Sequence, residues 1–340
     1  AITYAIFTIC KSGDNIISTQ TLYGGTYNLF AHTLPQLGIE VRFADPADID
    51  SMARLADEHT RAVFCESIGN PLGHIVDISA LADMAHAHGL PLIVDNTVPS
   101  PYLCRPFEHG ADIVVHSLTK YLGGHGTSIG GVIVDSGTFP WAEHKDRFPQ
   151  LNEPDVSYHG VIYTEALGPA AYIGRARVVP LRNMGSAISP FNSFLVLQGI
   201  ETLPLRMECH CENALAVARH LQGHDQIEWV NYAALDEHAD KPLVDKYMQG
   251  KAAGILTFGI KGGLEAGAKF IDALKLAVRL VNIGDAKTLA CHPATTTHRQ
   301  LNPEEMKKAG VSEDMVRLSI GIEHIDDIIA DLDQALAAAK

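Results

Sequence analysis

The residues with the clearest chemical potential lie around Lys120, in the segment Ser-Leu-Thr-Lys-Tyr at positions 117–121. Apolar residues 113–115 precede this segment, and glycines are frequent in residues 123–126, directly after it. We therefore expect Lys120 to follow the carboxyl end of a buried strand, among hydroxyls and small residues that let a ligand approach the backbone. A lysine amine in such a place is a nucleophile that can bond to a carbonyl carbon.

The neighbouring polar residues match the needs of one cofactor, pyridoxal phosphate. This cofactor requires an amine for its aldehyde, a carboxylate that keeps its pyridine nitrogen protonated, and donors for its phosphate. Lys120 supplies the amine, and Asp95, at the end of the apolar run 92–94, supplies the carboxylate. Ser117 and Thr119 supply part of the phosphate site. A single lysine in a hydroxyl-rich loop is usually a solvated surface residue, but the acidic group after a second apolar run favours a Schiff base between Lys120 and the cofactor.

Short apolar strands alternate with helices in the first part of the chain. The pattern predicts helices at 47–56 and 77–88 and strands at 15–18, 40–43, 62–65, 92–94 and 113–115. Such alternation is typical of a mostly parallel sheet with helices on both faces, in which ligands bind beyond the carboxyl ends of the strands. The predicted fold class is therefore α/β, with Asp95 and Ser117 at one edge of the sheet.

The second part of the chain has a different pattern. Residues 138–163 lack a clear period and are expected to form a long loop. The later pattern predicts strands at 254–260 and 315–319 and helices at 165–177, 191–220, 264–281 and 325–338. These elements predict a large cofactor-binding domain at 1–188 and a smaller C-terminal α+β domain at 189–340.

Several segments resemble the Cys/Met-metabolism family of fold-type I pyridoxal-phosphate enzymes, and the resemblance runs over essentially the whole chain. The segments are E-S-I-G-N-P at 66–71, V-D-N-T at 94–97 and H-S-L-T-K-Y at 116–121. Within the family, residues 22–30 and 153–160 look most like those of the O-acetylhomoserine sulfhydrylases. The resemblance implies a mostly parallel, seven-stranded-type sheet sandwiched by helices, as in aspartate aminotransferase, and pyridoxal 5'-phosphate as the cofactor.

The resemblance also assigns functions to residues outside the lysine segment. It implies that Tyr23 stacks on the cofactor ring and assists the leaving group, and that Asn70 contacts both cofactor and substrate. Residues 316–323 look like a C-terminal signature of the family in which an arginine, here Arg317, holds the substrate carboxylate. A guanidinium suits this task because it meets a carboxylate with two parallel hydrogen bonds. Thr288 is expected to add a contact to the same carboxylate.

The activity implied by the resemblance is γ-replacement on O-acetyl-L-homoserine. Sulfide, or a thiol such as methanethiol, would replace acetate to give homocysteine or methionine, with Lys120 as the base and Asp95 keeping the ring protonated. Glycines follow Tyr23 where the resembling methionine γ-lyases carry a cysteine, which argues against that reaction. Two alternatives stay open: a cystathionine γ-synthase or β/γ-lyase of the same family, and a catalytically impaired fragment or scaffold relative.

The first residues, 1–6, read as the middle of a helix. In the resembling family a Ser-Gly turn that holds the cofactor phosphate precedes this helix, and still earlier residues reach a neighbouring subunit. We therefore expect a fragment, a processed chain or a disordered N-terminus, so that the N-terminal segment of the large domain is missing from residues 1–188. The resemblance further implies a homotetramer built as a dimer of dimers that share active sites.

Composition excludes several other functions. The 340 residues include 26 Lys and Arg against 40 Asp and Glu, a formal charge of −14, which disfavours nucleic acids and anionic membranes as partners. No apolar run reaches the roughly 20 residues of a membrane helix. Six scattered cysteines are typical of reduced thiols in a cytoplasmic protein. No metal site is expected, because Cys209 and Cys211 point about 200° apart on a predicted helix and cannot share an ion.

Overall fold

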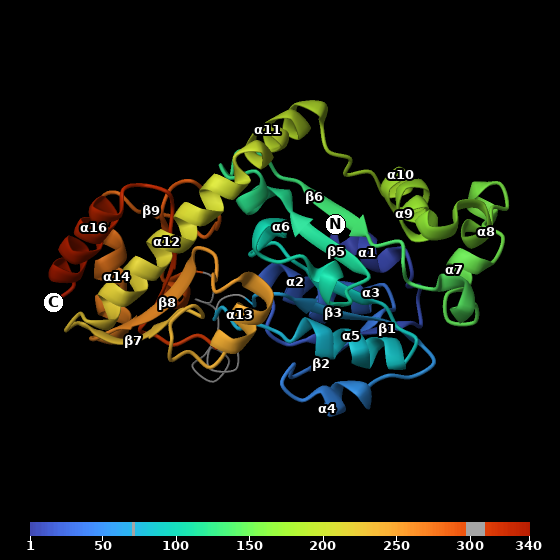
Figure 1. Cartoon of the computed structure of the whole chain (residues 1–340), viewed down its shortest axis with the longest axis horizontal. Coiled ribbons are helices and arrows are strands. Elements are labelled where there is room, and N and C mark those ends of the chain that lie inside the picture. The colour runs from blue at the N-terminus through green and yellow to red at the C-terminus, as the bar shows by residue number, and fades with distance from the viewer. Residues whose placement is uncertain (70–71, 297–309) are drawn as a thin grey trace.

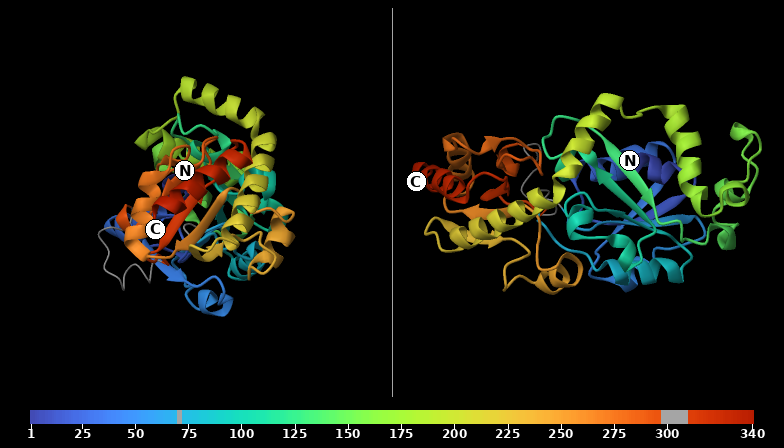
Figure 2. Two further views of the ribbon diagram at one scale, coloured as in Figure 1. Left: turned by 90° about the vertical axis from the view of Figure 1, so that its left-hand side faces the viewer. Right: turned by 45° about the horizontal axis from the view of Figure 1, so that its top comes forward.

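The computed structural model describes residues 1–69, 72–296 and 310–340, which contain two sheets with helices packed around them (Figures 1 and 2). The larger sheet has the strand order β2-β1-β3-β4-β5-β6. Its strands are β1 (Asn15–Thr19), β2 (Glu40–Ala44), β3 (Thr60–Glu66), β4 (Leu92–Asp95), β5 (Ile113–Ser117) and β6 (Gly131–Asp135).

The first five strands pair in parallel, and β6 is antiparallel to β5. This confirms the predicted mostly parallel α/β sheet and each of the five strands predicted for it. In the described residues the sheet has six strands rather than the expected seven. After β6 the chain continues into a series of short helices.

Both faces of the larger sheet are buried, as the apolar strands require. Side chains alternate along a strand, and so Ile113 and Val115 of β5 belong to one apolar cluster while Val114 belongs to the other. The covering helices are α1 (Ile2–Phe7), α2 (Gly24–Asn28), α3 (Leu34–Gln36), α4 (Ile49–Ala53), α5 (Ile78–Ala87) and α6 (Ser100–Leu103).

Helix α5 shows why the sequence predicted these helices well. Asp77 precedes it and accepts the N–H of Ala80 at 3.1 Å, which satisfies one of the free donors at the helix start. Its buried residues include Ile78, Leu81 and Ala85, whose spacing of three and four places them on one face toward the sheet.

The segment expected to be a long loop contains short helices instead. They are a turn at Trp141–His144, α7 (Pro149–Asn152), a turn at Val156–Tyr158 and the start of α8 (Tyr163–Leu167). The helix predicted at 165–177 is also divided, because Gly168 adopts a φ of +54° and Pro169 follows it. Its second half is α9 (Ala171–Ala176), and α10 (Arg182–Met184) comes after it.

The smaller sheet has the order β7-β8-β11-β10-β9. Its strands are β7 (Ile227–Asn231), β8 (Ile255–Ile260), β9 (Val278–Arg279), β10 (Leu289–Cys291) and β11 (Met315–Ser319). The helices of this part are α11 (Pro190–Glu201), α12 (Leu203–Gln222), α13 (Lys241–Met248), α14 (Gly263–Ala273) and α16 (Ile325–Ala338). The domain boundary at 188/189 stays a prediction.

One predicted helix divides into two, and another ends earlier than expected. The helix predicted at 191–220 divides at Thr202 into α11 and α12, because Pro204 cannot supply a backbone N–H to a continuous helix. The helix predicted at 264–281 stops at Ala273. Asp331 of α16 accepts the N–H groups of the next residues, 275 to 277, at 2.8–2.9 Å and so draws the chain away from the helical path.

Helix α12 joins the two sheets. It packs against α6 beside the larger sheet and against β7, β8 and α16 in the smaller part, and Figure 1 shows it extending across that part toward α11. Tyr121, fully buried after β5, accepts the N–H of Gly254 at 3.1 Å just before β8. The residues after Lys120 are therefore anchored to both sheets.

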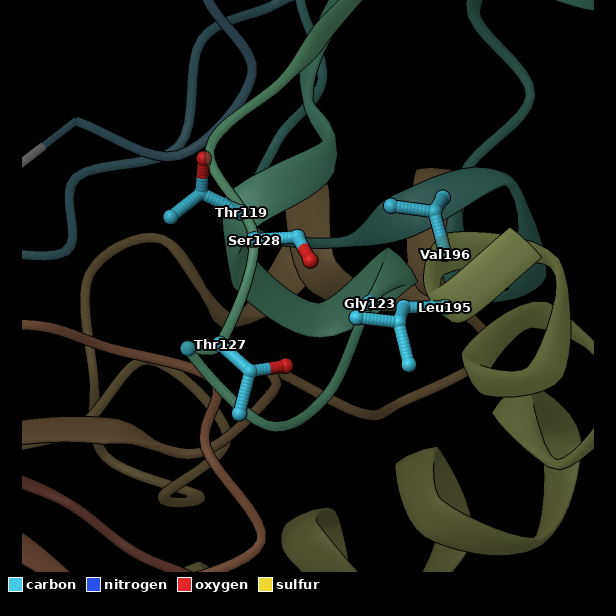
Figure 3. Close-up of a pocket in the computed structure, with 7 residues that line it drawn as sticks. Thr119, Gly123, Thr127, Ser128, Leu195 and Val196 are labelled. Atoms are coloured by element: carbon cyan, nitrogen blue, oxygen red, sulfur yellow. The ribbon is translucent and has the colours of Figure 1, made fainter. Parts of the chain in front are cut away.

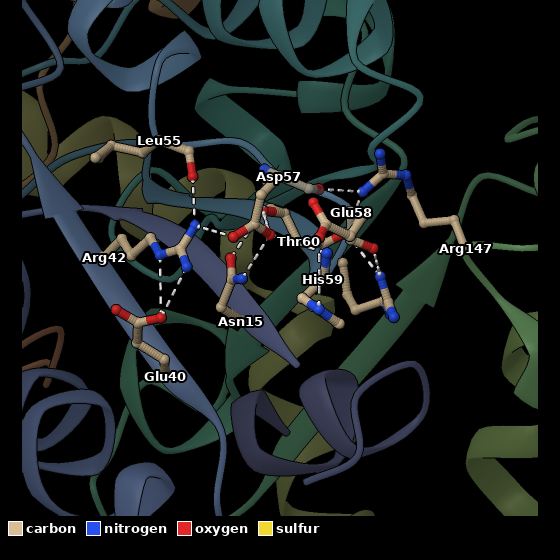
Figure 4. A network of polar contacts seen from close by, with 10 residues as sticks. Asn15, Glu40, Arg42, Leu55, Asp57, Glu58, His59, Thr60 and Arg147 are labelled. Atoms are coloured by element: carbon tan, nitrogen blue, oxygen red, sulfur yellow. Dashed lines mark hydrogen bonds and ion pairs between the residues drawn. The ribbon is translucent and has the colours of Figure 1, made fainter. Parts of the chain in front are cut away.

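A polar network holds together β1, β2 and β3 of the larger sheet (Figure 4). Asp57 accepts from Asn15 at 2.9 Å and pairs with Arg42 at 2.7 Å. Thr60 donates to Asn15 at 2.8 Å, and Arg147 donates to the backbone oxygens of Asp57 and Thr60. This network contains none of the residues that the sequence predicts for the cofactor site.

The buried ion pair between Asp14 and Arg61 gives a prediction about stability. The two side chains are 2 % and 6 % exposed and 2.7 Å apart. Asp14→Ala leaves a buried guanidinium without its counterion and is expected to lower the free energy of unfolding by about 3 kcal/mol in urea titrations. Glu265→Ala, which removes the exposed partner of Lys269, is the control and should cost less than about 1 kcal/mol. Equal losses in the two variants would contradict this prediction.

Candidate active site

Lys120 lies in a wide helical turn, Leu118–Leu122, directly after β5. The backbone leaves helical geometry at Lys120, where φ is −93° and ψ is −134°. Its half-buried amine donates to Oδ1 of Asn282. Burial, and next to it the charge of Arg317, lower the pKa of Lys120 to about 8. The amine is therefore neutral, and nucleophilic, far more often than an ordinary lysine at physiological pH.

Arg317 reaches the same place from the smaller sheet. It lies on β11, is 7 % exposed, and donates from Nη2 to the backbone oxygen of Val281. The next residue, Asn282, accepts from Lys120. Two consecutive residues after β9 thus hold the predicted base and the predicted carboxylate ligand close together. Sequence reasoning missed Asn282 because the preceding residues looked helical.

Asp95 ends β4 and is connected to the lysine segment by hydrogen bonds. Its Oδ1 accepts from the backbone N–H and the hydroxyl of Thr97 at 2.9 and 2.5 Å. The Thr97 oxygen in turn accepts the N–H of Ser117 at 2.8 Å. Burial raises the pKa of Asp95, and the bonds from Thr97 act in the opposite direction. Thr97 is a second residue to which sequence reasoning gave no role, although it lies in the V-D-N-T segment.

Tyr23 lies at the same edge of the sheet. Its backbone N–H donates to Oε1 of Glu66 at 2.8 Å, and its ring is 50 % exposed. Glu66 ends β3 directly opposite Asp95, so two carboxyl groups lie side by side at neighbouring strand ends. Burial first, and then the Asp95 carboxylate, raise the pKa of Glu66 well above its ordinary value. The acceptor that holds the Tyr23 loop is therefore a carboxyl group that resists ionisation.

Hydroxyl groups gather beside the lysine turn. Thr119 Oγ1 accepts the N–H of Gly130 at 3.2 Å. Ser128 Oγ is buried and has no hydrogen-bond partner among the described residues. Both belong to a small pocket that Figure 3 shows between the lysine turn, the glycine-rich loop and α11. The lining residues are Thr119, Gly123, Gly126, Thr127, Ser128, Leu195 and Val196.

Two further predicted site residues remain, Thr288 and Asn70. The Thr288 hydroxyl is fully buried, donates to Glu323 at 2.9 Å and accepts the N–H of Gly321 at 2.9 Å. It holds two loops of the smaller part together, and the expected contact with a substrate carboxylate has no support in this geometry. Asn70 lies outside the described residues.

The donor set fits pyridoxal phosphate. The edge of one parallel sheet presents an amine, a carboxyl group and several hydroxyls. Two of these, the buried Ser128 Oγ and the buried Thr19 Oγ1 at the end of β1, have no hydrogen-bond partner within the part of the chain that the structure describes. Lys120 would hold the aldehyde carbon, Asp95 the pyridine nitrogen, and Ser117 with Thr119 part of the phosphate. A lysine after a strand of a mostly parallel, helix-covered sheet, with an aspartate at a neighbouring strand end, is the arrangement of a fold-type I pyridoxal-phosphate enzyme.

Comparison with known proteins agrees with this class. The chain belongs to the family of Cys/Met metabolism PLP-dependent enzymes, whose family model matches residues 1–337. The expected family and cofactor are therefore confirmed.

Individual relatives are similar over nearly the whole chain. A homocysteine synthase of Schizosaccharomyces pombe is 52 % identical over 340 residues, which are 100 % of this chain and 79 % of the relative. An O-acetyl-L-homoserine sulfhydrylase of Leptospira meyeri is 51 % identical, over 98 % of this chain and 77 % of the relative. A crystal structure described as an O-acetylhomoserine (thiol)-lyase from Campylobacter jejuni, with a pyridoxyl-lysine phosphate group, has a TM-score of 0.95 at 42 % identity and covers 99 % of this chain and 80 % of that one.

No cluster of three or more His, Cys, Asp or Glu side chains with metal-binding geometry occurs in residues 1–69, 72–296 and 310–340. None of the helices in the described part of the chain combines the length and apolar character that a membrane crossing requires.

The position of Glu66 predicts how stability depends on pH. Because its folded-state pKa lies above its unfolded value of about 4.3, the folded chain binds more protons between these values, and stability falls as pH rises through this window. Glu66→Gln cannot ionise and still accepts from Tyr23. The free energy of unfolding of Glu66→Gln, relative to that of wild type, should therefore increase progressively from about pH 4 upward. Urea titration at several pH values measures this difference. Parallel pH curves for the two proteins would contradict the buried, uncharged carboxyl group.

Proposed function

We propose that this protein replaces the acetate of O-acetyl-L-homoserine by sulfide, or by a thiol such as methanethiol, and so forms L-homocysteine or L-methionine. The C–O bond at Cγ breaks, acetate leaves, and the sulfur nucleophile bonds to the same carbon. One observation carries the proposal: a half-buried Lys120 amine next to Arg317 at the sheet edge that bears Asp95. The relatives named above as homocysteine synthase and O-acetyl-L-homoserine sulfhydrylase support this choice of substrate.

The residues of the site have distinct tasks in this reaction. Arg317 binds the substrate carboxylate with two parallel hydrogen bonds and so orients the α-carbon. When bound, pyridoxal phosphate draws negative charge from that carbon into its ring. The neutral form of Lys120, which its lowered pKa makes more abundant than in an ordinary lysine, removes the α proton with Nζ, which Asn282 orients. Asp95 stabilises the proton on the pyridine nitrogen by its negative charge.

Tyr23 is proposed to stack on the cofactor ring and to assist the departure of acetate. Its backbone N–H is held by Glu66, while the residue is half exposed. Gly25 lies so close to this ring that a Cβ atom there would come within 2.5 Å of it. This close approach supports a γ-replacement site over the γ-lyase arrangement with a cysteine after the tyrosine.

Replacement of the lysine tests the proposed reaction. Lys120→Ala removes the base and the amine that holds the cofactor, and kcat for homocysteine formation from O-acetylhomoserine and sulfide should fall about 1000-fold. The absorbance band near 420 nm should also be lost. Lys269→Ala, on the exposed face of α14, should leave both unchanged. Homocysteine formation at the wild-type rate in Lys120→Ala would exclude this lysine as the base, and no formation by wild type with added cofactor would reject the reaction.

We further propose a homotetramer, and the surface of α11 supports it. Phe191, Phe194 and Leu197 follow one another at intervals of three, and their side chains are 67 %, 55 % and 58 % exposed. They form an apolar stripe on a helix that Figure 2 shows at the outside of the molecule. Contiguous exposed apolar residues of this kind mark association surfaces, and a second copy of the chain is the occupant that the family resemblance implies.

This assembly is tested by its mass in solution. The double variant Phe191→Ser with Phe194→Ser should shift sedimentation velocity profiles from four copies toward two or one, because each substitution removes about 1.5–3 kcal/mol of apolar burial per interface copy. Leu37→Ser is the control. Leu37 is also apolar, is 50 % exposed and lies elsewhere on the surface, so its substitution should leave the mass in solution unaltered. A wild-type monomer would reject the assembly, and a tetrameric double variant would reject α11 as its interface.

A cytoplasmic location is also proposed. All six cysteines are free thiols, and four of them lie in the buried cores beside the two sheets, where no disulfide partner is in place: Cys10, Cys65, Cys104 and Cys211. Reduced thiols of this kind are typical of proteins from reducing compartments.

A further inference from the structure

Arg206 of α12 is buried next to the lysine turn and has an unusual set of partners. Its side chain is 5 % exposed. Nη1 donates to the backbone oxygen of Tyr121 at 2.7 Å, and Nη2 donates to those of Gly199 at 2.6 Å and Leu122 at 3.5 Å. Nε donates to the hydroxyl of Thr202 at 3.1 Å. Among the described residues no carboxylate forms an ion pair with this guanidinium.

Two of these acceptors belong to the residues immediately after Lys120. The last carbonyls of a helical turn have no partner within the turn, and a planar guanidinium can satisfy several of them at fixed angles. The third carbonyl, of Gly199, lies near the end of α11. One side chain therefore joins the lysine turn, α11 and α12.

The packing around the guanidinium leaves little freedom. Gly124 has a φ of +74°, and a Cβ atom there would lie 2.5 Å from Cζ of Arg206. A Cβ atom at Gly199 would lie 2.2 Å from the backbone oxygen of Gly123. Figure 3 shows Leu195 of α11 beside Gly123. Neither α11 nor α12 can shift against the lysine turn without displacing the Arg206 side chain.

The smaller part of the chain holds the turn from another direction. Ala286 donates its backbone N–H to the oxygen of Gly124 at 2.9 Å. A Cβ atom at Gly284 would lie 2.6 Å from the backbone nitrogen of Tyr121. Asn282, two residues earlier, accepts from the Lys120 amine. The position of Lys120 relative to Asn282 therefore depends on how the turn is held between this loop and Arg206.

The charge of Arg206 makes a purely space-filling role a poor explanation. Burial lowers its pKa, which means that the surroundings disfavour the charged form. An uncharged side chain of similar volume would fill the same space without this cost. The guanidinium is useful because its planar, rigid set of N–H donors fixes the directions of several carbonyl groups at once.

We propose that Arg206 is a positioning residue for Lys120: it fixes the backbone of the lysine turn from the α12 side, so that the amine lies at Asn282 and next to Arg317. This inference rests on the proposed role of Lys120 as the base. Arg206 touches neither substrate nor cofactor, and so it acts on the rate through the placement of the amine.

Arg206→Lys and Arg206→Met test this in the holoenzyme. Lysine keeps the positive charge but lacks the planar set of N–H donors, and methionine has no side-chain donor. We expect kcat to fall about 10-fold in the first and about 100-fold in the second, because small displacements of a reacting group have effects of this size. KM for O-acetylhomoserine should stay within about twofold, because Arg317 is untouched. The visible circular dichroism of the cofactor band, which reports its orientation, should weaken in the same order.

Arg175→Lys and Arg175→Met are the matched controls. Arg175 also donates to two backbone carbonyls, those of Phe7 and Thr8 at 3.2 and 2.5 Å, but it joins α9 to α1 rather than to the lysine turn. Its variants should lose stability without a change in kcat or in the circular dichroism band. All proteins are compared at the same interval below their own Tm, so that loss of folded protein does not enter the comparison.

The outcomes separate the inference from the proposed function. Arg206 variants that lose stability as the Arg175 variants do, with wild-type kcat and circular dichroism, would overturn the positioning role. If wild type forms no homocysteine, the proposed function fails, whereas the circular dichroism band still reports on Arg206. If Arg206→Met does not fold, Arg206→Lys carries the test. Amide hydrogen exchange in residues 118–124, faster in either Arg206 variant than in the Arg175 variants, gives a readout independent of the cofactor.

Discussion

The site depends on one turn that two different sheets hold at the same time. Lys120 follows β5 of the larger sheet, yet its amine donates to Asn282, which follows β9 of the smaller sheet. The next residue, Tyr121, accepts the N–H of Gly254 before β8. Burial between the two parts also lowers the pKa of the Lys120 amine. The packing of the two sheets therefore sets both the position and the basicity of the amine.

The charged groups of the site are also divided between the two sheets. The larger sheet contributes the carboxyl groups of Glu66 and Asp95 at adjacent strand ends, and the smaller sheet contributes Arg317. Lys120 lies at the junction and interacts with the charge of Arg317. Under the proposed function, an amino-acid substrate would have its carboxylate toward the smaller sheet and its α-carbon at Lys120. The cofactor ring would extend toward the carboxyl groups, so that the field across the site favours one orientation of the substrate.

Local patterns predicted the larger sheet and the strand ends that carry Lys120 and Asp95, because alternation of short apolar strands with helices determines where the carboxyl ends lie. The features that local patterns did not predict depend on contacts with residues far away in the sequence. The predicted helix over 264–281 stops because Asp331, more than fifty residues later, binds the backbone of 275–277. This interaction places Asn282 at the site. Arg206 likewise acts on residues about 85 positions earlier in the chain, and no spacing within its own helix indicates that contact.

The glycine at position 25 determines how much space the Tyr23 ring has. The Tyr23 backbone is fixed by Glu66, but the ring has only the space that Gly25 leaves, since a Cβ atom there would approach it to 2.5 Å. A cysteine at this position would force the exposed ring to rotate away while the backbone stayed bound to Glu66. Under the proposed role of Tyr23, stacking on a planar ring requires a particular ring orientation, and such a change would alter the side chain that assists the leaving group. Glycine at this position therefore leaves room for the orientation of the Tyr23 ring seen here.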